Sequence, residues 1–167
     1  MHLDVFDGFL CDLDGCLISG STVLPGAKTL LEYAGDRLII LSNNSTDTPA
    51  TLSARLKRLG LSAPPERIVL AGTAALDHLA QIGEVRLRLC ANADLRAYAH
   101  AIGLSLDGPE PTHVLLTRDE TFGYNDLRDV VAFLAKGAEL FVANPDESHP
   151  GPEGTPIPET GSLLAAI

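Results

Sequence analysis

Two aspartates near the N-terminus have a spacing that permits chemistry. Asp12 and Asp14 flank Leu13 and precede Gly15. Because alternate residues of a β-strand project from the same face, both carboxylates converge where an apolar strand ends. Such a pair favours a hard cation with oxygen ligands, Mg²⁺ above all, and one carboxylate can act as a nucleophile while the other exchanges protons. Since Asp-Gly is also a frequent turn pair, the alternative is a solvated corner without chemistry.

A second polar segment follows the next apolar run. Ser42-Asn43-Asn44-Ser45 comes directly after the residues Arg37 to Leu41. If both runs are strands of one parallel sheet, their carboxyl ends lie at the same edge, where α/β proteins bind ligands. A hydroxyl, an amide and backbone N–H groups there form a neutral cradle for an anion. The alternative is a polar loop that caps the following helix.

These segments require an α/β fold to position them. Short apolar runs separated by helical patterns are typical of buried parallel strands with crossover helices. The helix from Thr48 to Leu59 has capping candidates in Asp47 and Thr48, and Pro49 suits its first position. The first half is therefore predicted to be βαβαβ, with strands in Val5–Leu13, Arg37–Ser42 and Arg67–Ala71.

The second half repeats the theme. Its expected strands are Val85–Cys90, His113–Thr117 and Glu139–Ala143, and its expected helices are Ala93–Ile102 and Asn125–Lys136. The Pro- and Gly-rich stretch 144–160 is expected to be irregular, and 161–167 to begin a helix. A polar break at Gln81 to Glu84 predicts two domains, 1–81 and 82–167.

Composition excludes several classes. The chain has 167 residues, with 12 basic and 22 acidic side chains and a net charge of −10. Without a Lys/Arg cluster, nucleic acid and anionic membrane are not expected partners. No apolar run reaches the roughly 18 residues of a membrane span. The segment Met1–Asp7 lacks the basic start of a secretory signal, and three cysteines without metal spacing fit a reducing cytoplasm.

The remaining residue patterns do not favour another metal, nucleotide or phosphoaccepting site. The five histidines have no ligand-like spacing, and no Gly-rich dinucleotide fingerprint is present. Cys11 is expected to be a buried structural thiol facing away from Asp12, and Cys16 an oxidation-sensitive thiol if exposed. A receiver-type phosphoaccepting switch would need adjacent acids after the first strand and an aspartate near the third, where this sequence has Gly72-Thr73.

The motifs together resemble the haloacid dehalogenase (HAD) superfamily of aspartate-nucleophile phosphatases. Asp12-Leu13-Asp14-Gly15 has the form of its first motif, and Ser42 that of its second. The similarity is to the 4-nitrophenylphosphatase-like branch with pyridoxal phosphate and phosphoglycolate phosphatases, which has a type IIA cap. It rests further on Pro25-Gly26-Ala27, Gly123-Tyr124-Asn125, Ala143-Asn144-Pro145-Asp146 and Thr160-Gly161-Ser162-Leu163.

The resemblance implies a Rossmann-like core and a cap. Asp12 would form an aspartyl-phosphate, and Asp14 would act as general acid and base. The Asp12 carboxylate and the Asp14 backbone carbonyl would bind Mg²⁺, while Ser42 and Asn43, with Asn44 beside them, would hold the phosphoryl oxygens. The substrate would be a small phosphorylated metabolite.

The cap side of the site is also implied. Residues Leu17 to Leu24 would form a flap, and the chain from Gln81 would form an α/β cap. Within that cap, Asn144 and Asp146 would face the site, although Asn-Pro-Asp is equally a turn signal.

One departure from the family pattern affects the expected activity. The family continues with a Gly-Lys-Pro segment and a strand ending in Gly-Asp, which supply a lysine and further metal carboxylates. None of Lys28, Lys57 and Lys136 fits that lysine. We expect an open edge at Phe9 to Leu13 and a weak or absent phosphatase activity, unless a second copy or a C-terminal segment on another chain completes the site. The alternative function is a non-catalytic binding or regulatory module, with a homodimer as one of its expected forms.

Overall fold

The computed structural model describes residues 5–151 and 154–167. The chain forms two compact units. Unit 1 comprises Met1–Ser42 and Pro49–Leu70, and unit 2 comprises Asn43–Thr48 and Ala71–Ile167. The boundary expected near Gln81 thus falls after Leu70, and the loop that follows Ser42 belongs to unit 2. Part of the segment Met1–Asp7, considered above as a signal, lies outside the described residues.

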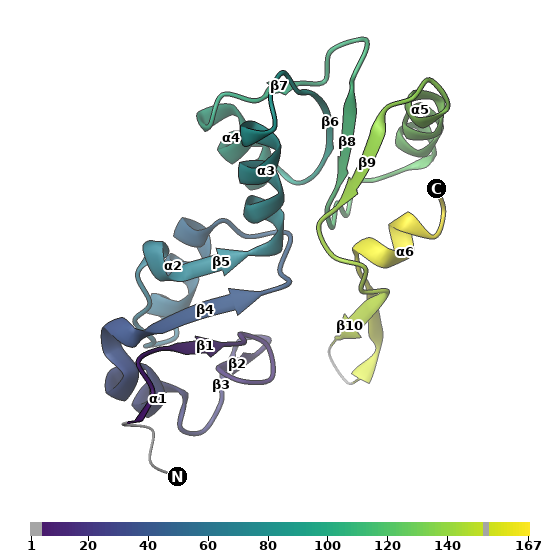
Figure 1. Cartoon of the computed structure of the whole chain (residues 1–167). Coiled ribbons are helices and arrows are strands. Elements are labelled where there is room, and N and C mark those ends of the chain that lie inside the picture. Colours follow the sequence, from purple (N-terminus) through teal and green to yellow (C-terminus); the bar gives the residue numbers. More distant parts are fainter. Residues whose placement is uncertain (1–4, 152–153) are drawn as a thin grey trace. The chain divides into compact units, whose positions relative to one another are not determined.

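Unit 1 contains a three-stranded parallel sheet. Its strands are β1 (Phe9–Cys11), β4 (Leu38–Ser42) and β5 (Ile68–Leu70), in the order β1-β4-β5. Helix α1 (Ala27–Ala34) connects β1 to β4, and α2 (Pro49–Arg58) connects β4 to β5. A small hairpin of β2 (Ile18–Ser19) and β3 (Thr22–Val23) precedes α1. Figure 1 shows β1, β4 and β5 side by side. The expected βαβαβ order is confirmed, although β1 is shorter than the run Val5–Leu13.

One face of this sheet packs into a core. Its inward residues alternate along each strand and meet α1 and α2, forming a cluster that includes Leu38, Ile40, Ile68, Leu70, Leu31, Leu52 and Leu56. Residues of the opposite face are exposed: Leu10 by 73%, Ile39 by 38%, Leu41 by 47% and Val69 by 41%. In the described part of the chain β1 pairs with β4 alone, so β1 is an edge strand of this sheet.

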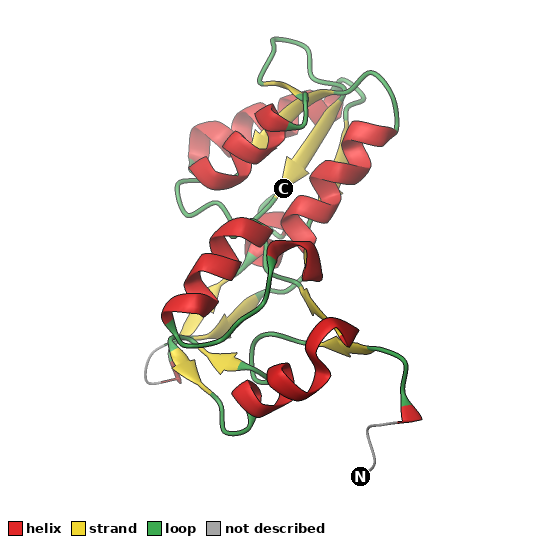
Figure 2. Cartoon of the chain, turned by 90° about the vertical axis from the view of Figure 1, so that its left-hand side faces the viewer, coloured by secondary structure: helices red, strands yellow, loops and turns green. Residues whose placement is uncertain are grey.

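Unit 2 contains a four-stranded parallel sheet in the order β7-β6-β8-β9. Its strands are β6 (Arg86–Cys90), β7 (Ser105–Leu106), β8 (His113–Leu116) and β9 (Glu139–Val142). Its helices are α3 (Ala71–Gln81), α4 (Ala93–Ala101) and α5 (Tyr124–Ala135). Figure 2 shows the helices of each unit flanking that unit's strands. The sequence prediction missed α3, because it follows β5 without a turn signal between them.

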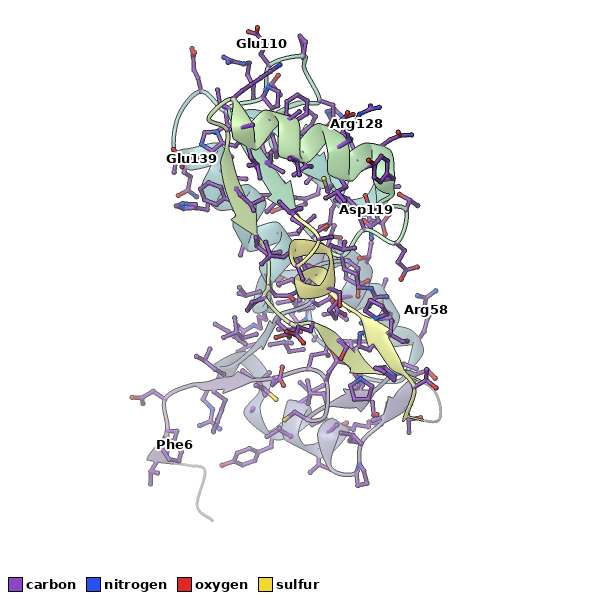
Figure 3. The ribbon with its side chains drawn as sticks, turned by 90° about the vertical axis from the view of Figure 1, so that its right-hand side faces the viewer. Phe6, Arg58, Glu110, Asp119, Arg128 and Glu139 are labelled. Atoms are coloured by element: carbon purple, nitrogen blue, oxygen red, sulfur yellow. The ribbon has the colours of Figure 1, made fainter. Side chains whose placement is uncertain are left out.

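Both faces of this sheet are covered. Leu87, Leu89 and Leu115 pack with Leu76 of α3 and Leu95 of α4. The alternate positions pack on the other side, in a cluster that includes Cys90, Val114, Leu116, Val130, Phe133 and Leu163. Figure 3 shows the side chains of this unit, with the labelled Arg128 on α5 and Glu139 on β9. Covering on both faces explains why the central strand β8 is buried at three consecutive apolar positions, Val114 to Leu116.

The stretch expected to be irregular contains a hairpin. Strands β10 (Ser148–Pro150) and β11 (Pro156–Pro158) pair antiparallel, and α6 (Thr160–Leu164) follows. The Gly151 N–H donates to the Thr155 carbonyl over 2.8 Å, next to the paired strands. Among the described residues, no helix is long and apolar enough to cross a membrane.

Candidate active site

The two aspartates lie just beyond the carboxyl end of β1. Asp12 and Asp14 are exposed, whereas Leu13 between them is fully buried, so the alternation of the strand continues past its last paired residue. The Leu13 N–H donates to Asp12 Oδ1 over 2.8 Å. The chain then turns at Gly15, whose φ of 79° favours glycine. Both carboxylates are therefore exposed beside the carboxyl end of β1, and their convergence stays a prediction.

Ser42 lies at the same sheet edge. It is the last residue of β4, the parallel neighbour of β1, and it is 5% exposed. The register pairs Cys11 of β1 with Ile40 of β4. The residue after Cys11 is Asp12, and the residues after Ile40 are Leu41 and Ser42. Unit 1 therefore places the two predicted carboxylates and the predicted hydroxyl at the carboxyl ends of neighbouring strands, with Ser42 continuing the buried positions of β4 and the aspartates exposed.

The donor set at this edge fits Mg²⁺. Two exposed carboxylates and the main-chain carbonyls beside them offer oxygen atoms, which Mg²⁺ prefers, and this ion commonly binds through one or two carboxylates while keeping several waters. Among the described residues, no group of three or more His, Cys, Asp or Glu side chains is placed to hold a metal ion.

The side chain of Asn44 shapes the loop after β4. Asn44 Oδ1 accepts hydrogen bonds from the backbone N–H groups of Thr46, over 2.9 Å, and Asp47, over 2.8 Å. Its amide donates to Asp47 Oδ2 over 3.0 Å. Asn44 thus acts as an Asx turn, one of the two alternatives that the sequence left open for this segment.

Ser45 is a buried hydrogen-bonding centre that the sequence analysis did not single out. It is 2% exposed, and its Oγ accepts from the Arg118 backbone N–H over 3.1 Å and from the Asn144 amide over 3.3 Å. A further hydrogen bond of 3.2 Å joins it to Thr160 Oγ1, which is also buried. Partners this distant in sequence leave no local signal beyond the residue types themselves.

The predicted cap residues contact the predicted phosphate loop, within unit 2. Asn144 is 6% exposed and donates to the Asn43 carbonyl over 2.9 Å. The Asp146 carboxylate accepts a hydrogen bond from the Asn43 side-chain amide. Gly161 permits this packing, because a Cβ there would lie 2.6 Å from the Asp146 carbonyl oxygen. Unit 2 thus brings Asn43, Asn144 and Asp146 together.

An ion pair lies beside this loop. Arg118, whose backbone holds Ser45, pairs through its guanidinium with Glu159 over 3.0 Å and with Glu120 over 2.6 Å. The hydrogen bond and charge of Arg118 lower the pKa of Glu120. Glu120 and Glu159 neutralise the Arg118 guanidinium. It therefore orders the loop between β8 and α5 and does not present a free positive charge.

Comparisons with known proteins agree with these observations. The family model of haloacid dehalogenase-like hydrolases matches residues 9–105. The dihydroxyacetone phosphatase of Corynebacterium glutamicum (strain R) is 35% identical over 163 residues, which are 95% of this chain and 59% of that protein.

Two solved structures show the same fold. The 4-nitrophenylphosphatase of Thermotoga maritima aligns with a TM-score of 0.87 at 29% identity, covering 96% of this chain and 62% of that one. The glycerol phosphate phosphatase of Mycobacterium tuberculosis, in complex with magnesium, gives 0.87 at 28% identity, covering 96% and 50%. This chain therefore spans about half to three-fifths of the length of these relatives.

The family match covers more than half of the chain and contains both aspartates, Ser42 and the loop after it. The expected resemblance and the α/β fold are both confirmed by these likenesses. The chain belongs to the haloacid dehalogenase-like hydrolases.

Proposed function

We propose that this chain carries the nucleophile and phosphate-binding segments of a Mg²⁺-dependent phosphatase of small phosphorylated metabolites. The observation that carries the proposal is the placement of Asp12 and Asp14 at the end of one strand and Ser42 at the end of its parallel neighbour. The relatives named above act on dihydroxyacetone phosphate and glycerol phosphate by their names, which favours sugar or polyol phosphates as substrates.

The proposed reaction proceeds in two displacements. The Asp12 carboxylate attacks phosphorus and forms an aspartyl-phosphate, while the Asp14 carboxyl gives its proton to the departing alkoxide. Asp14 then takes a proton from water, which attacks the same phosphorus and frees Asp12. Bound Mg²⁺ offsets the charge of the two carboxylates and the phosphoryl oxygens.

The phosphoryl group needs donors that are held in place. We assign this role to the Ser42 hydroxyl and to the Asn43 amide group. Asn44 contributes by shaping the loop through its turn, since its side-chain oxygen already accepts two backbone hydrogen bonds. Asn144 and Asp146 hold Asn43 within unit 2, which preorganises the Asn43 amide group before the substrate binds.

The test is hydrolysis of 4-nitrophenyl phosphate and dihydroxyacetone phosphate by the full chain, with and without Mg²⁺. We expect Asp12→Asn to lower any Mg²⁺-dependent rate by roughly a thousandfold, because it removes the nucleophile. The matched control is Asp7→Asn, which changes an exposed aspartate near β1 and leaves the rate unchanged. An unchanged rate in Asp12→Asn would contradict the proposal.

A second candidate function is a binding module that is inactive on its own. It is favoured by the exposed apolar face of Leu10, Ile39, Leu41 and Val69 and by the open edge at β1. The three lysines lie on α1, on α2 and at the end of α5, and none of them occupies the Gly-Lys-Pro segment that the resemblance implies for the family's lysine. This reading predicts no turnover by the chain alone.

A mixing experiment distinguishes the two candidate functions. The C-terminal part of the Thermotoga 4-nitrophenylphosphatase, beyond the region that this chain matches, would be added in increasing amounts. Restored Mg²⁺-dependent turnover that Asp12→Asn abolishes would support a phosphatase completed by another polypeptide. Association without turnover would support the binding module.

A further inference from the structure

Two thiols lie in contact on either side of the Asp12–Gly15 segment. Cys11 Sγ and Cys16 Sγ are 3.4 Å apart. Cys11 is 6% exposed, whereas Cys16 is exposed to solvent. The reaction proposed above uses neither thiol, so their contact requires a separate explanation.

The backbone holds this contact in place on both sides. Cys11 is the last residue of β1 and is paired with Ile40 of β4. After Gly15 the chain returns through hydrogen bonds from Leu17 N–H to the Leu13 carbonyl, over 2.9 Å, and from Gly15 N–H to the Ile18 carbonyl, over 2.8 Å. A disulfide has its sulfur atoms roughly 2.0 Å apart, so the two sulfurs need a small further approach to bond.

We propose that Cys11 and Cys16 are an oxidation site that closes a reversible disulfide around Asp12 and Asp14. The oxidant is a peroxide, which meets the exposed thiol first. Cys16 Sγ takes one oxygen atom from hydrogen peroxide, becomes a sulfenic acid and releases water. Cys11 Sγ then displaces that oxygen as a second water, so that two thiols and one peroxide give one disulfide and two waters. A dithiol reductant reverses the step by exchange.

The disulfide would restrain the segment that carries both carboxylates. Closing the bond draws Cys16 toward β1 and moves the turn that begins at Asp14. This consequence rests on the proposed phosphatase function, in which both carboxylates must meet the phosphoryl group. Because small displacements of reacting groups are costly, we expect the oxidised chain to hydrolyse phosphate esters roughly tenfold more slowly or worse, with recovery on reduction.

The experiment treats the full chain with hydrogen peroxide, unfolds it and blocks free thiols with N-ethylmaleimide. We expect an intact mass that is two hydrogens lighter and carries one maleimide, on Cys90, which is buried in unit 2. Peptide mapping should join the Cys11 and Cys16 peptides. Cys90→Ser is the matched control and should form the same disulfide without an adduct, whereas Cys16→Ser should form no intrachain disulfide.

Several results would overturn the site. These are three maleimides on the treated wild-type chain, a disulfide between two copies through Cys16, or a Cys16 sulfinic acid beside an alkylated Cys11. The mass readout needs no catalysis, so a disulfide in a chain without Mg²⁺-dependent turnover would support the site, and the mixing experiment would decide the phosphatase proposal separately. A disulfide that leaves existing turnover unchanged would overturn the inferred restraint on Asp12 and Asp14.

Discussion

The two parallel sheets of this chain differ in how they are covered. In unit 2, apolar clusters fill both faces of the β7-β6-β8-β9 sheet. In unit 1, α1 and α2 cover one face of the β1-β4-β5 sheet, and the other presents the four exposed residues Leu10, Ile39, Leu41 and Val69. Since parallel sheets are almost always buried on both faces, unit 1 has a surface suited to a partner.

The proposed catalytic aspartates therefore lie in unit 1, whose sheet is covered on one face, and not in unit 2, whose sheet is covered on both. The carboxylates and Ser42 lie on the half-covered sheet, whereas the loop that follows Ser42 is fixed by buried hydrogen bonds within unit 2. The cap side is therefore expected to be rigid on its own. The half-covered sheet is the surface on which a polypeptide that completes the proposed phosphatase would pack.

The largest expected effect compares two leucines of β4. Leu38 is 3% exposed and Leu41 is 47% exposed, on opposite faces of the same strand. Leu38→Ala should lower the free energy of unfolding by about 2–5 kcal/mol, because it opens a cavity in the core. Leu41→Ala should cost less than about 1 kcal/mol. Urea unfolding followed by circular dichroism measures both, and equal costs would show that the second face is covered in solution.

An intermediate effect is expected at Asn144. Asn144→Ala removes the donor to the Asn43 carbonyl and to Ser45 Oγ, so it should lower the free energy of unfolding by about 1–3 kcal/mol. The KM of any active form for phosphate esters should rise with it, since Asn43 loses its support. The control is Asn125→Ala, an exposed asparagine at the start of α5. If both variants unfolded at the same urea concentration, the loop would not depend on this bond.

The smallest effect on stability is expected at the open edge. Leu10 is 73% exposed on β1, and Leu10→Lys places a charge where another strand or sheet would pack. We expect less concentration-dependent association in sedimentation velocity, with little change in unfolding. Tyr124→Lys, which alters an 81% exposed ring in unit 2, is the control and should leave association unchanged. The same fall in association for both would point to a general charge effect.

Much of the fold could be predicted from local patterns. The apolar runs at Arg37–Ser42 and His113–Thr117 became β4 and β8 nearly to the residue, and Pro49 begins α2 as its fixed φ suggests. The β10–β11 hairpin was missed because its strands are themselves Pro-rich. The bare face of unit 1 could not be foreseen, because strand composition alone does not say what covers each side.

Only those features of the candidate site that follow from the order of residues along the chain could be predicted from the sequence. The alternation at Asp12 and Asp14 and the position of Ser42 at a strand end follow from sequence spacing. The pairing of Ser45 with Thr160, and the turn that brings Cys16 back to Cys11, depend on the folded path of the chain. Residue types at these positions gave no sign of their partners.

The most direct test of the central claim is to trap the phosphoryl group. The Asp14→Asn chain would be incubated with 4-nitrophenyl phosphate and Mg²⁺, quenched in acid and digested for mass spectrometry. Without the base that activates water, the aspartyl-phosphate should accumulate, so one phosphoryl group is expected on Asp12, and none in Asp12→Asn/Asp14→Asn. A label on another residue, or no label at saturating substrate and Mg²⁺, would contradict Asp12 as the nucleophile.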